Sequence, residues 1–279
     1  NGAGKTTVIK MLLGILRPTS GSGLITGAAM RSGERAVRGR VGYMSQQFSL
    51  YEDLTVTENI RLYAGVYGLP RSAAGGRLRW VLAMAGLGDH TADRAGTLPV
   101  GLKQRLALGC ALVHRPRVLF LDEPTSGVDP LGRRRFWRIL ERLAREAGVA
   151  MVVTTHYMSE AEHCDRLALM YAGRIAASGS PREMKQAVEE EAGGLLEVRT
   201  RRPLQALGPL EEAGVEGVSL HGREIHLLAW DADEAAERIG GLLQEHGLDL
   251  ESVRRRPLTM EDVFVYHTRG LERREGEAA

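Results

Sequence analysis

The first seven residues of the chain carry its densest group of residues that could do chemistry. They are Asn1-Gly2-Ala3-Gly4-Lys5-Thr6-Thr7, and the first six of them match the last six positions of the phosphate-binding pattern G-x-x-x-x-G-K-[ST]. Glycines let successive backbone N–H groups face one cavity, and a helix that starts at Gly4 directs its positive dipole end there. Lys5 adds a charge for the β- and γ-phosphates, and the Thr6 hydroxyl can ligate Mg²⁺. These seven residues therefore predict a nucleoside-triphosphate site.

Two adjacent carboxylates follow an apolar segment of strand length. Val118–Leu121 has the composition of a strand buried on both faces, and Asp122 and Glu123 come directly after it. Open parallel sheets bind ligands at the carboxyl ends of their strands. There Asp122 can hold Mg²⁺, and Glu123 can polarise a water molecule for attack on a γ-phosphate. Two solvated acids at a strand end are the simpler alternative, but the phosphate-binding pattern earlier in the chain favours the functional interpretation.

A histidine follows the next predicted strand. Val149–Thr155 is apolar and strand-sized, and His156 comes after it. We expect His156 to emerge at the same sheet edge as Asp122. An imidazole there can hydrogen-bond both a γ-phosphate and the attacking water. His156 is therefore a candidate catalytic residue, whereas His114 and His163 have no comparable context.

Strand-sized apolar segments alternate with helical patterns along the chain. Gly4–Leu16 and Arg133–Gly148 have the apolar spacing of helices, and residues 51–114 are mostly helical with breaks at glycines. This alternation predicts an α/β fold with a mostly parallel sheet and a helical subdomain. The predicted strands are Leu24–Ile25, Val41–Met44, Val118–Leu121, Val149–Thr155, Leu167–Tyr171 and Arg174–Ala177.

We place a domain boundary near Glu189–Gly194, where three glutamates precede two glycines. Residues 1–188 would then form the nucleotide-binding domain. Residues 195–268 predict a small α+β domain with the element order βαββαβ, which is typical of ferredoxin-like domains. The charged segment 269–279 is expected to be disordered.

The composition excludes several classes of protein. The chain has 37 basic and 35 acidic residues, a net charge of +2, which argues against nucleic acid as a partner. No run of 18 consecutive apolar residues occurs, so we expect no membrane-spanning helix, and no signal peptide is visible. Cys110 and Cys164 are the two cysteines, and both are expected to be buried thiols.

Five motifs follow one another along residues 1 to about 184. They are the partial phosphate-binding pattern, Tyr43-Met44-Ser45-Gln46, Leu121-Asp122-Glu123-Pro124, Ser126-Gly127-Val128-Asp129 and Thr155-His156. In this order they resemble the motifs of the ATPases of ABC transporters. The resemblance implies a P-loop NTPase cassette that binds ATP and Mg²⁺ and pairs with a second cassette. It also implies that Gln46 contacts Mg²⁺ and water, that Glu123 is the catalytic base and that His156 is the switch histidine. Asp129 would belong to a loop that crosses to the second cassette.

The segment that aligns with the family's L-S-G-G-Q signature departs from it. It is Leu98-Pro99-Val100-Gly101-Leu102, followed by Lys103-Gln104-Arg105-Leu106. Pro99 replaces a serine that, in this family, contacts the γ-phosphate of the opposing cassette. Such a hydrogen bond is worth roughly 1.5–3 kcal/mol, which corresponds to closure about 10- to 150-fold weaker. Gly101 and the helix start can still approach phosphate, so we expect a weakened half-site.

Further segments resemble cassettes of ABC-2-type exporters. These are Phe48–Tyr51, Leu54–Asn59, His156–Glu162 and Thr259–Phe264. The resemblance implies a multi-span permease partner and a position at the cytoplasmic face of the membrane. Two alternatives stay open: a soluble ABC ATPase acting on ribosomes or nucleic acid, and a nucleotide-dependent regulator that does not hydrolyse ATP. Because Asn1 falls inside the phosphate-binding pattern, we also expect the family's first strand and its adenine-stacking aromatic residue to be missing.

Overall fold

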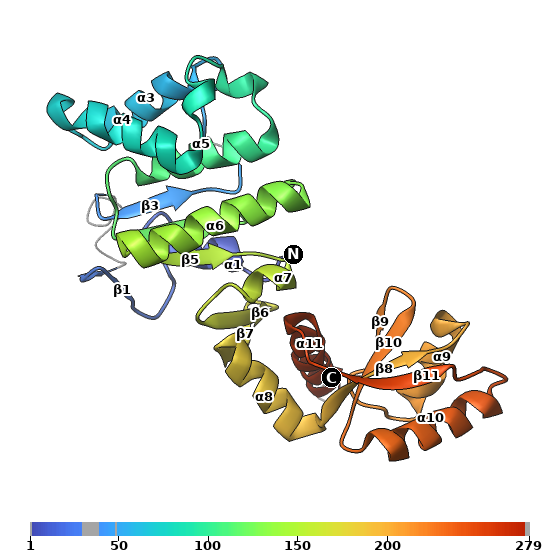
Figure 1. Cartoon of the computed structure of the whole chain (residues 1–279). Helices are drawn as coiled ribbons and strands as arrows, with labels where there is room; N and C mark the ends of the chain where they lie inside the picture. The colour runs from blue at the N-terminus through green and yellow to red at the C-terminus, as the bar shows by residue number, and fades with distance from the viewer. Residues whose placement is uncertain (1, 30–38, 48, 277–279) are drawn as a thin grey trace. The chain divides into compact units, whose positions relative to one another are not determined.

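The computed structural model describes residues 2–29, 39–47 and 49–276, so Asn1 and Phe48 lie outside the described residues. The chain divides into two compact units, Asn1–His156 and Tyr157–Ala279 (Figure 1). Among the helices of the described ranges, none combines the length and the apolar character needed to span a bilayer.

A parallel sheet of three strands organises the N-terminal unit. Its order is β3 (Val41–Met44), β4 (Val118–Asp122) and β5 (Ala150–Thr154), with β4 in the centre. The apolar run before Asp122 makes β4 the buried strand, as the sequence predicts. Because Asp122 pairs with Thr154, the carboxyl ends of β4 and β5 meet at one edge of the sheet.

The helices of the N-terminal unit begin and end at recognisable signals. Thr55 and Glu58 form a capping box at the start of α3. The helix expected to begin at Arg133 begins at Pro130, because the Asp129 side chain caps it. Residues 71–85 and 100–112 form helices that contact each other and α3. The elements around the sheet are α1 (Lys5–Leu12), β1 (Leu24–Ile25), β2 (Ala28–Ala29), α3 (Val56–Val66), α4 (Arg71–Ala85), η2 (Gly88–His90), η3 (Ala95–Thr97), α5 (Val100–Leu112) and α6 (Pro130–Ala147).

The C-terminal unit contains an antiparallel sheet with the strand order β11-β8-β10-β9. Together with α9 and α10, these strands confirm the predicted βαββαβ element order. One sheet face packs on α9 and α10 through a core that includes Leu196, Val198 and Ile225. The elements are α7 (Met158–Ala161), β6 (Leu167–Tyr171), β7 (Arg174–Gly179), α8 (Pro181–Ala192), β8 (Gly194–Arg199), α9 (Pro203–Glu212), β9 (Ser219–His221), β10 (Glu224–Ala229), α10 (Ala232–Glu245), β11 (Ser252–Arg256) and α11 (Met260–Gly276).

Two boundaries differ from those expected. The chain divides after His156 and not near residue 188, because a shared core joins residues 158–192 to the ferredoxin-like part. In that core, Met184 and Val188 of α8 pack with Met260 and Val263 of α11. The expectation of a disordered segment from residue 269 is wrong up to residue 276, because α11 continues to Gly276.

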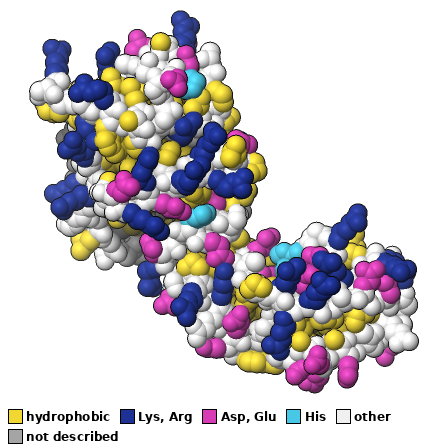
Figure 2. Space-filling model, viewed as in Figure 1, with side chains coloured by type: hydrophobic (Ala, Val, Ile, Leu, Met, Phe, Trp, Pro, Cys, Tyr) yellow, Lys and Arg dark blue, Asp and Glu magenta, His cyan; other side chains and the backbone are white. Residues whose placement is uncertain are grey.

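Neither the charges on the face shown in Figure 2 nor the two cysteines indicate a specialised function. On the face shown in Figure 2, basic and acidic side chains are interspersed. Both cysteines are free, but only Cys110 is buried, whereas Cys164 is partly accessible. Burial raises the pKa of the Cys164 thiol to about 11, and the acidic groups of Asp165 and Glu160 add to that rise. Both cysteines are therefore thiols, as expected, although Cys164 is not fully buried.

Candidate functional site

Side chains from three other segments of the N-terminal unit contact the Glu123 carboxylate. Lys5 Nζ lies 3.8 Å from Glu123 Oε1. Gln46 Nε2 donates to Glu123 Oε2 at 3.2 Å, and His156 Nδ1 lies 3.2 Å from the same oxygen. We call Lys5, Gln46, Glu123 and His156 the Glu123 cluster. The structure thus brings together the Lys5 ammonium, the Gln46 amide and the His156 imidazole, the first and last of which are more than a hundred residues apart in the sequence.

The neighbouring carboxylate, Asp122, is buried and only 1% exposed. Its Oδ1 accepts hydrogen bonds from Thr6 Oγ1 at 3.1 Å and from Thr154 Oγ1 at 2.6 Å. Within the part of the chain that the structure describes, its Oδ2 has no hydrogen-bond partner. A buried, unpaired carboxylate oxygen beside a threonine hydroxyl is the donor set that Mg²⁺ prefers. Burial and the charge of Asp122 also raise the pKa of nearby Tyr43.

The main chain at Glu123 adopts an unusual conformation. Its φ is +49°, in the left-handed region that costs a non-glycine residue energy and is enriched at functional sites. Two hydrogen bonds hold it there, because the Glu123 N–H donates to both the carbonyl oxygen and the Oγ1 of Thr154, each at 3.1 Å. Strand β5 therefore fixes the direction in which the Glu123 side chain leaves the sheet.

Thr154 is a site residue that the sequence analysis did not single out. Its hydroxyl donates to Asp122 and accepts from the Glu123 N–H, so it links both carboxylate residues. The available signal was a hydroxyl residue that ends the strand next to Val118–Leu121. Without the strand register, however, its pairing with Asp122 could not be known.

The phosphate-binding pattern has the expected local shape. Gly2 and Gly4 have φ values of +79° and +95°, which side chains disfavour, and α1 begins directly after them at Lys5. Thr6 lies in the first turn of α1, beside Asp122. Ala3 and Thr7 belong to the same loop and turn. The start of α1 therefore lies at the sheet edge that carries the two carboxylates.

Gly101 and Asp129 lie outside the Glu123 cluster, in two separate segments. Gly101 lies in the first turn of α5, and Pro99 is the residue before this helix, with no side-chain cap. Asp129 Oδ1 accepts from the N–H groups of Leu131 and Gly132 and so caps α6. Gln104 Nε2 of α5 donates to the Ser126 carbonyl oxygen at 3.2 Å, which ties the signature-like helix to the loop before α6.

Comparison with known sequences gives consistent results. The family model described as "ABC transporter" matches residues 1–126. The chain is 49% identical over 185 residues to the probable multidrug ABC transporter ATP-binding protein YbhF of Escherichia coli K12, covering 66% of the chain and 32% of YbhF. It is 36% identical over 268 residues to the Nod factor export ATP-binding protein I of Burkholderia lata, covering 95% of the chain and 84% of that relative. The chain thus spans about a third of the length of YbhF but most of the length of the second relative.

Solved structures point the same way. The cbiO1 protein of Clostridium perfringens, described as part of the ABC transporter complex cbiONQ, superposes with a TM-score of 0.61 at 29% identity, covering 68% of this chain and 80% of that one. The ATP-binding cassette MJ0796, solved as a dimer bound to ADP and Pi, superposes with a TM-score of 0.58 at 25% identity, covering 64% and 81%. These neighbours are ATP-binding cassettes of the α/β class.

Proposed function

Because the chain belongs to the ABC transporter family of ATP-binding proteins, we propose that it binds ATP with Mg²⁺, hydrolyses the ATP and thereby powers export through a membrane permease. The observation that carries this proposal is the Glu123 cluster beside Asp122 and Thr6. The Lys5 ammonium, the Asp122 carboxylate with its Thr6 partner, and the hydrogen-bonded Glu123 carboxylate converge at one sheet edge. Phosphoryl transfer depends mainly on such positioning and charge stabilisation.

In this proposal the start of the chain binds the triphosphate. The N–H groups around Gly2, Ala3 and Gly4 and the positive end of α1 attract phosphate oxygens. The Lys5 ammonium takes the β- and γ-phosphates, which its place beside Glu123 supports. Asn1 and Thr7 complete this binding segment. The main chain and one lysine thus supply affinity, whereas the carboxylates supply the chemistry.

Thr6, Asp122 and Gln46 are the residues that would hold Mg²⁺. The unpaired Oδ2 of Asp122 supports this assignment, since a buried carboxylate oxygen without a partner is costly. When bound, Mg²⁺ neutralises charge on the phosphate oxygens. Thr154 keeps the Asp122 carboxylate in place through its 2.6 Å hydrogen bond.

Glu123 is the proposed general base. With its Oε2 it would take a proton from the attacking water, while Gln46 and His156, both 3.2 Å from that oxygen, orient the water and the γ-phosphate. The strained main chain at Glu123 supports this role, because it fixes the carboxylate in one direction. His156 then distinguishes the ATP-bound state from the state after hydrolysis.

The finer assignment is to an ABC-2-type exporter. We propose a multi-span permease and a second cassette as partners, with the chain held at the cytoplasmic face of the membrane. Gly101 of α5 and the loop that ends at Asp129 would face the second cassette, and Gln104 supports this by joining them. The relatives are named for multidrug and Nod factor export, which supports outward transport.

Phosphate release by the full chain, with Mg²⁺ and ATP, tests the central claim. Lys5→Ala should weaken ATP binding about 10- to 150-fold, since a hydrogen bond to a charged group is worth roughly 1.5–3 kcal/mol. Lys10→Ala is the matched control, because Lys10 is an exposed residue of the same helix. Equal ATP affinity in both variants would contradict the site. Co-purification with ribosomes or nucleic acid, in place of a membrane protein, would contradict the transport role.

A further inference from the structure

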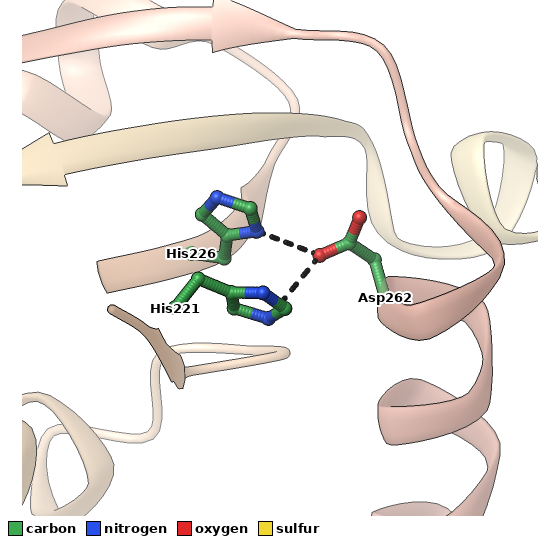
Figure 3. Close-up of side chains that lie close together, drawn as sticks. All are labelled: His221, His226 and Asp262. Atoms are coloured by element: carbon green, nitrogen blue, oxygen red, sulfur yellow. Dashed lines mark hydrogen bonds and ion pairs between the residues drawn. The ribbon is translucent and has the colours of Figure 1, made fainter. Parts of the chain in front are cut away.

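A second group of carboxylate and imidazole side chains lies in the C-terminal unit. His221 ends β9, His226 lies in β10, and Asp262 lies in the first turn of α11 (Figure 3). Because His221 pairs with Glu224, it shares one sheet face with His226, two residues further along β10. We call His221, His226 and Asp262 the Asp262 cluster. Nothing in the proposed ATP chemistry uses it.

The Asp262 carboxylate is held so that one oxygen faces both imidazoles. Its Oδ2 accepts from Thr259 N at 2.8 Å and from Thr259 Oγ1 at 2.6 Å. Its Oδ1 lies 2.7 Å from His226 Nδ1 and 3.7 Å from His221 Nε2. Dashed lines mark both contacts in Figure 3. The side chain of Asp262 is only 4% exposed, and those of His226 and His221 are 13% and 20% exposed. The helix cap therefore holds Asp262 Oδ1 toward the two imidazoles, in a largely buried site.

We propose that the Asp262 cluster binds a divalent transition-metal ion of the zinc class. Zn²⁺ takes histidine nitrogen and aspartate oxygen at about 2.0–2.2 Å with tetrahedral geometry, so its ligand atoms lie about 3.3 Å apart. The two distances to Asp262 Oδ1, 2.7 and 3.7 Å, bracket that value, and the three candidate ligand atoms all lie within 4.8 Å of one another. The two contacts of Asp262 Oδ1 therefore need changes of about 0.4–0.6 Å to reach the spacing of a zinc site.

The stacked rings determine how the ion would enter. The His221 and His226 rings are 4.0 Å apart and inclined by 13°, so one ion cannot lie in both ring planes at once. The more exposed ring, that of His221, turns to complete the site. Three protein ligands leave the fourth tetrahedral position for water, the arrangement of an open zinc site.

The choice of metal follows from the ligands. Imidazole nitrogen suits Zn²⁺ and its transition-metal neighbours, whereas Mg²⁺ and Ca²⁺ prefer oxygen. Glu197, opposite His226 in β8, is not counted as a ligand because Arg256 Nε holds its Oε2 at 2.9 Å. Arg199 lies 3.5 Å from the other Glu197 oxygen. These arginines balance Glu197, which leaves Asp262 as the ligand carboxylate.

Calorimetric titration of the full chain with Zn²⁺, in a buffer that contains excess Mg²⁺, tests the proposal. The wild type should bind one more Zn²⁺ ion than a His221→Ala/His226→Ala double variant. In the double variant the Zn²⁺ affinity of this site should fall by more than about 100-fold, since loss of an outer-shell partner alone costs 10- to 100-fold. His246→Ala is the matched control, because His246 is exposed in the same unit and its Nδ1 contacts the Leu242 carbonyl oxygen of its own helix. Equal Zn²⁺ uptake by all three proteins would overturn the proposal.

Co²⁺ provides a second readout that separates metal binding from folding. Tetrahedral Co²⁺ absorbs strongly in visible light, so the wild type and the His246→Ala control should show these bands. Each single variant, His221→Gln and His226→Gln, should lose them while keeping the circular dichroism of the wild type. A folded single variant that keeps the full Co²⁺ spectrum would show that the histidines form only a hydrogen-bonded cluster.

Discussion

The Glu123 cluster and the Asp262 cluster contain the same chemical groups, a carboxylate beside imidazole, but the chain fixes them differently. At Glu123 the sheet fixes the main chain in a strained conformation and leaves the carboxylate to side chains from other segments. At Asp262 the carboxylate is tied by its own helix cap, and the imidazoles come to it from a hairpin.

This difference has a functional meaning. A carboxylate whose partners are a lysine, an amide and an imidazole from separate segments can change partners when a substrate enters, as a general base must. A carboxylate held through one oxygen by its helix cap offers the other oxygen in a constant place, as a metal ligand must. The comparison therefore predicts that variants at Glu123 alter turnover, whereas variants near Asp262 alter stability and metal affinity.

The largest expected effect comes from Glu123→Gln. The amide keeps the size of the side chain but cannot accept the proton from water, so ATP turnover should fall roughly 10²- to 10⁴-fold while ATP affinity is retained. Single-turnover phosphate release and equilibrium nucleotide binding measure the two quantities separately. Glu146→Gln, an exposed position on α6, is the control that should leave both unchanged. Turnover that survives in Glu123→Gln would place the base elsewhere.

The next largest effect is expected at Thr154, and it tests how β5 positions the two carboxylate residues. Thr154→Val keeps the shape of the side chain but removes the hydroxyl that bonds both Asp122 and the Glu123 N–H. Two lost hydrogen bonds, one of them to a charged group, should lower kcat/KM by about 100-fold. Thr154→Ser retains the hydroxyl and should stay near wild type. If both variants lost activity equally, packing and not hydrogen bonding would explain the role of Thr154.

The sequence predicts the Glu123 cluster better than the Asp262 cluster. The phosphate-binding turn and the pair after Val118–Leu121 are runs of consecutive residues, and their local signals predict both the elements and their shared edge. The two histidines of the Asp262 cluster come from a hairpin, and Asp262 comes from a helix more than 30 residues later in the chain. Only the fold brings these segments together. The sequence does not predict the continuation of α11 past residue 269 for a related reason. The helix is anchored in a core through earlier residues such as Met260 and Val263, and the charged segment itself gives no local sign of that anchor.

A smaller effect is expected at the start of α5. Pro99 is exposed and provides no side-chain cap, so Pro99→Ser with Val100→Gly should restore a hydroxyl toward the second cassette. ATP turnover of the assembled pair should rise roughly tenfold, the lower end of what such a bond is worth, because the site is open to water. A serine cap also stabilises a helix, by about 1 kcal/mol. Thermal unfolding measured beside turnover distinguishes the two effects, and raised stability without raised turnover would contradict the proposed contact.

The smallest effect tests the Asp262 cluster without touching its ligands. Thr259→Val removes the hydroxyl that holds Asp262 Oδ2, a capping interaction worth about 1 kcal/mol, and should lower the unfolding temperature by about 2–4 °C. Thr268→Val is the control in the same helix, because its hydroxyl donates to the Phe264 and Val265 carbonyl oxygens of α11 itself.

Zn²⁺ affinity should fall about 10- to 100-fold in Thr259→Val and stay unchanged in Thr268→Val, since an outer-shell partner orients the ligand it contacts. ATP turnover should not change in either variant, because neither residue belongs to the Glu123 cluster or to the unit that contains it. A loss of stability with full Zn²⁺ affinity would mean that the helix cap holds the fold but does not position the carboxylate. The contrast drawn between the two clusters would then be wrong.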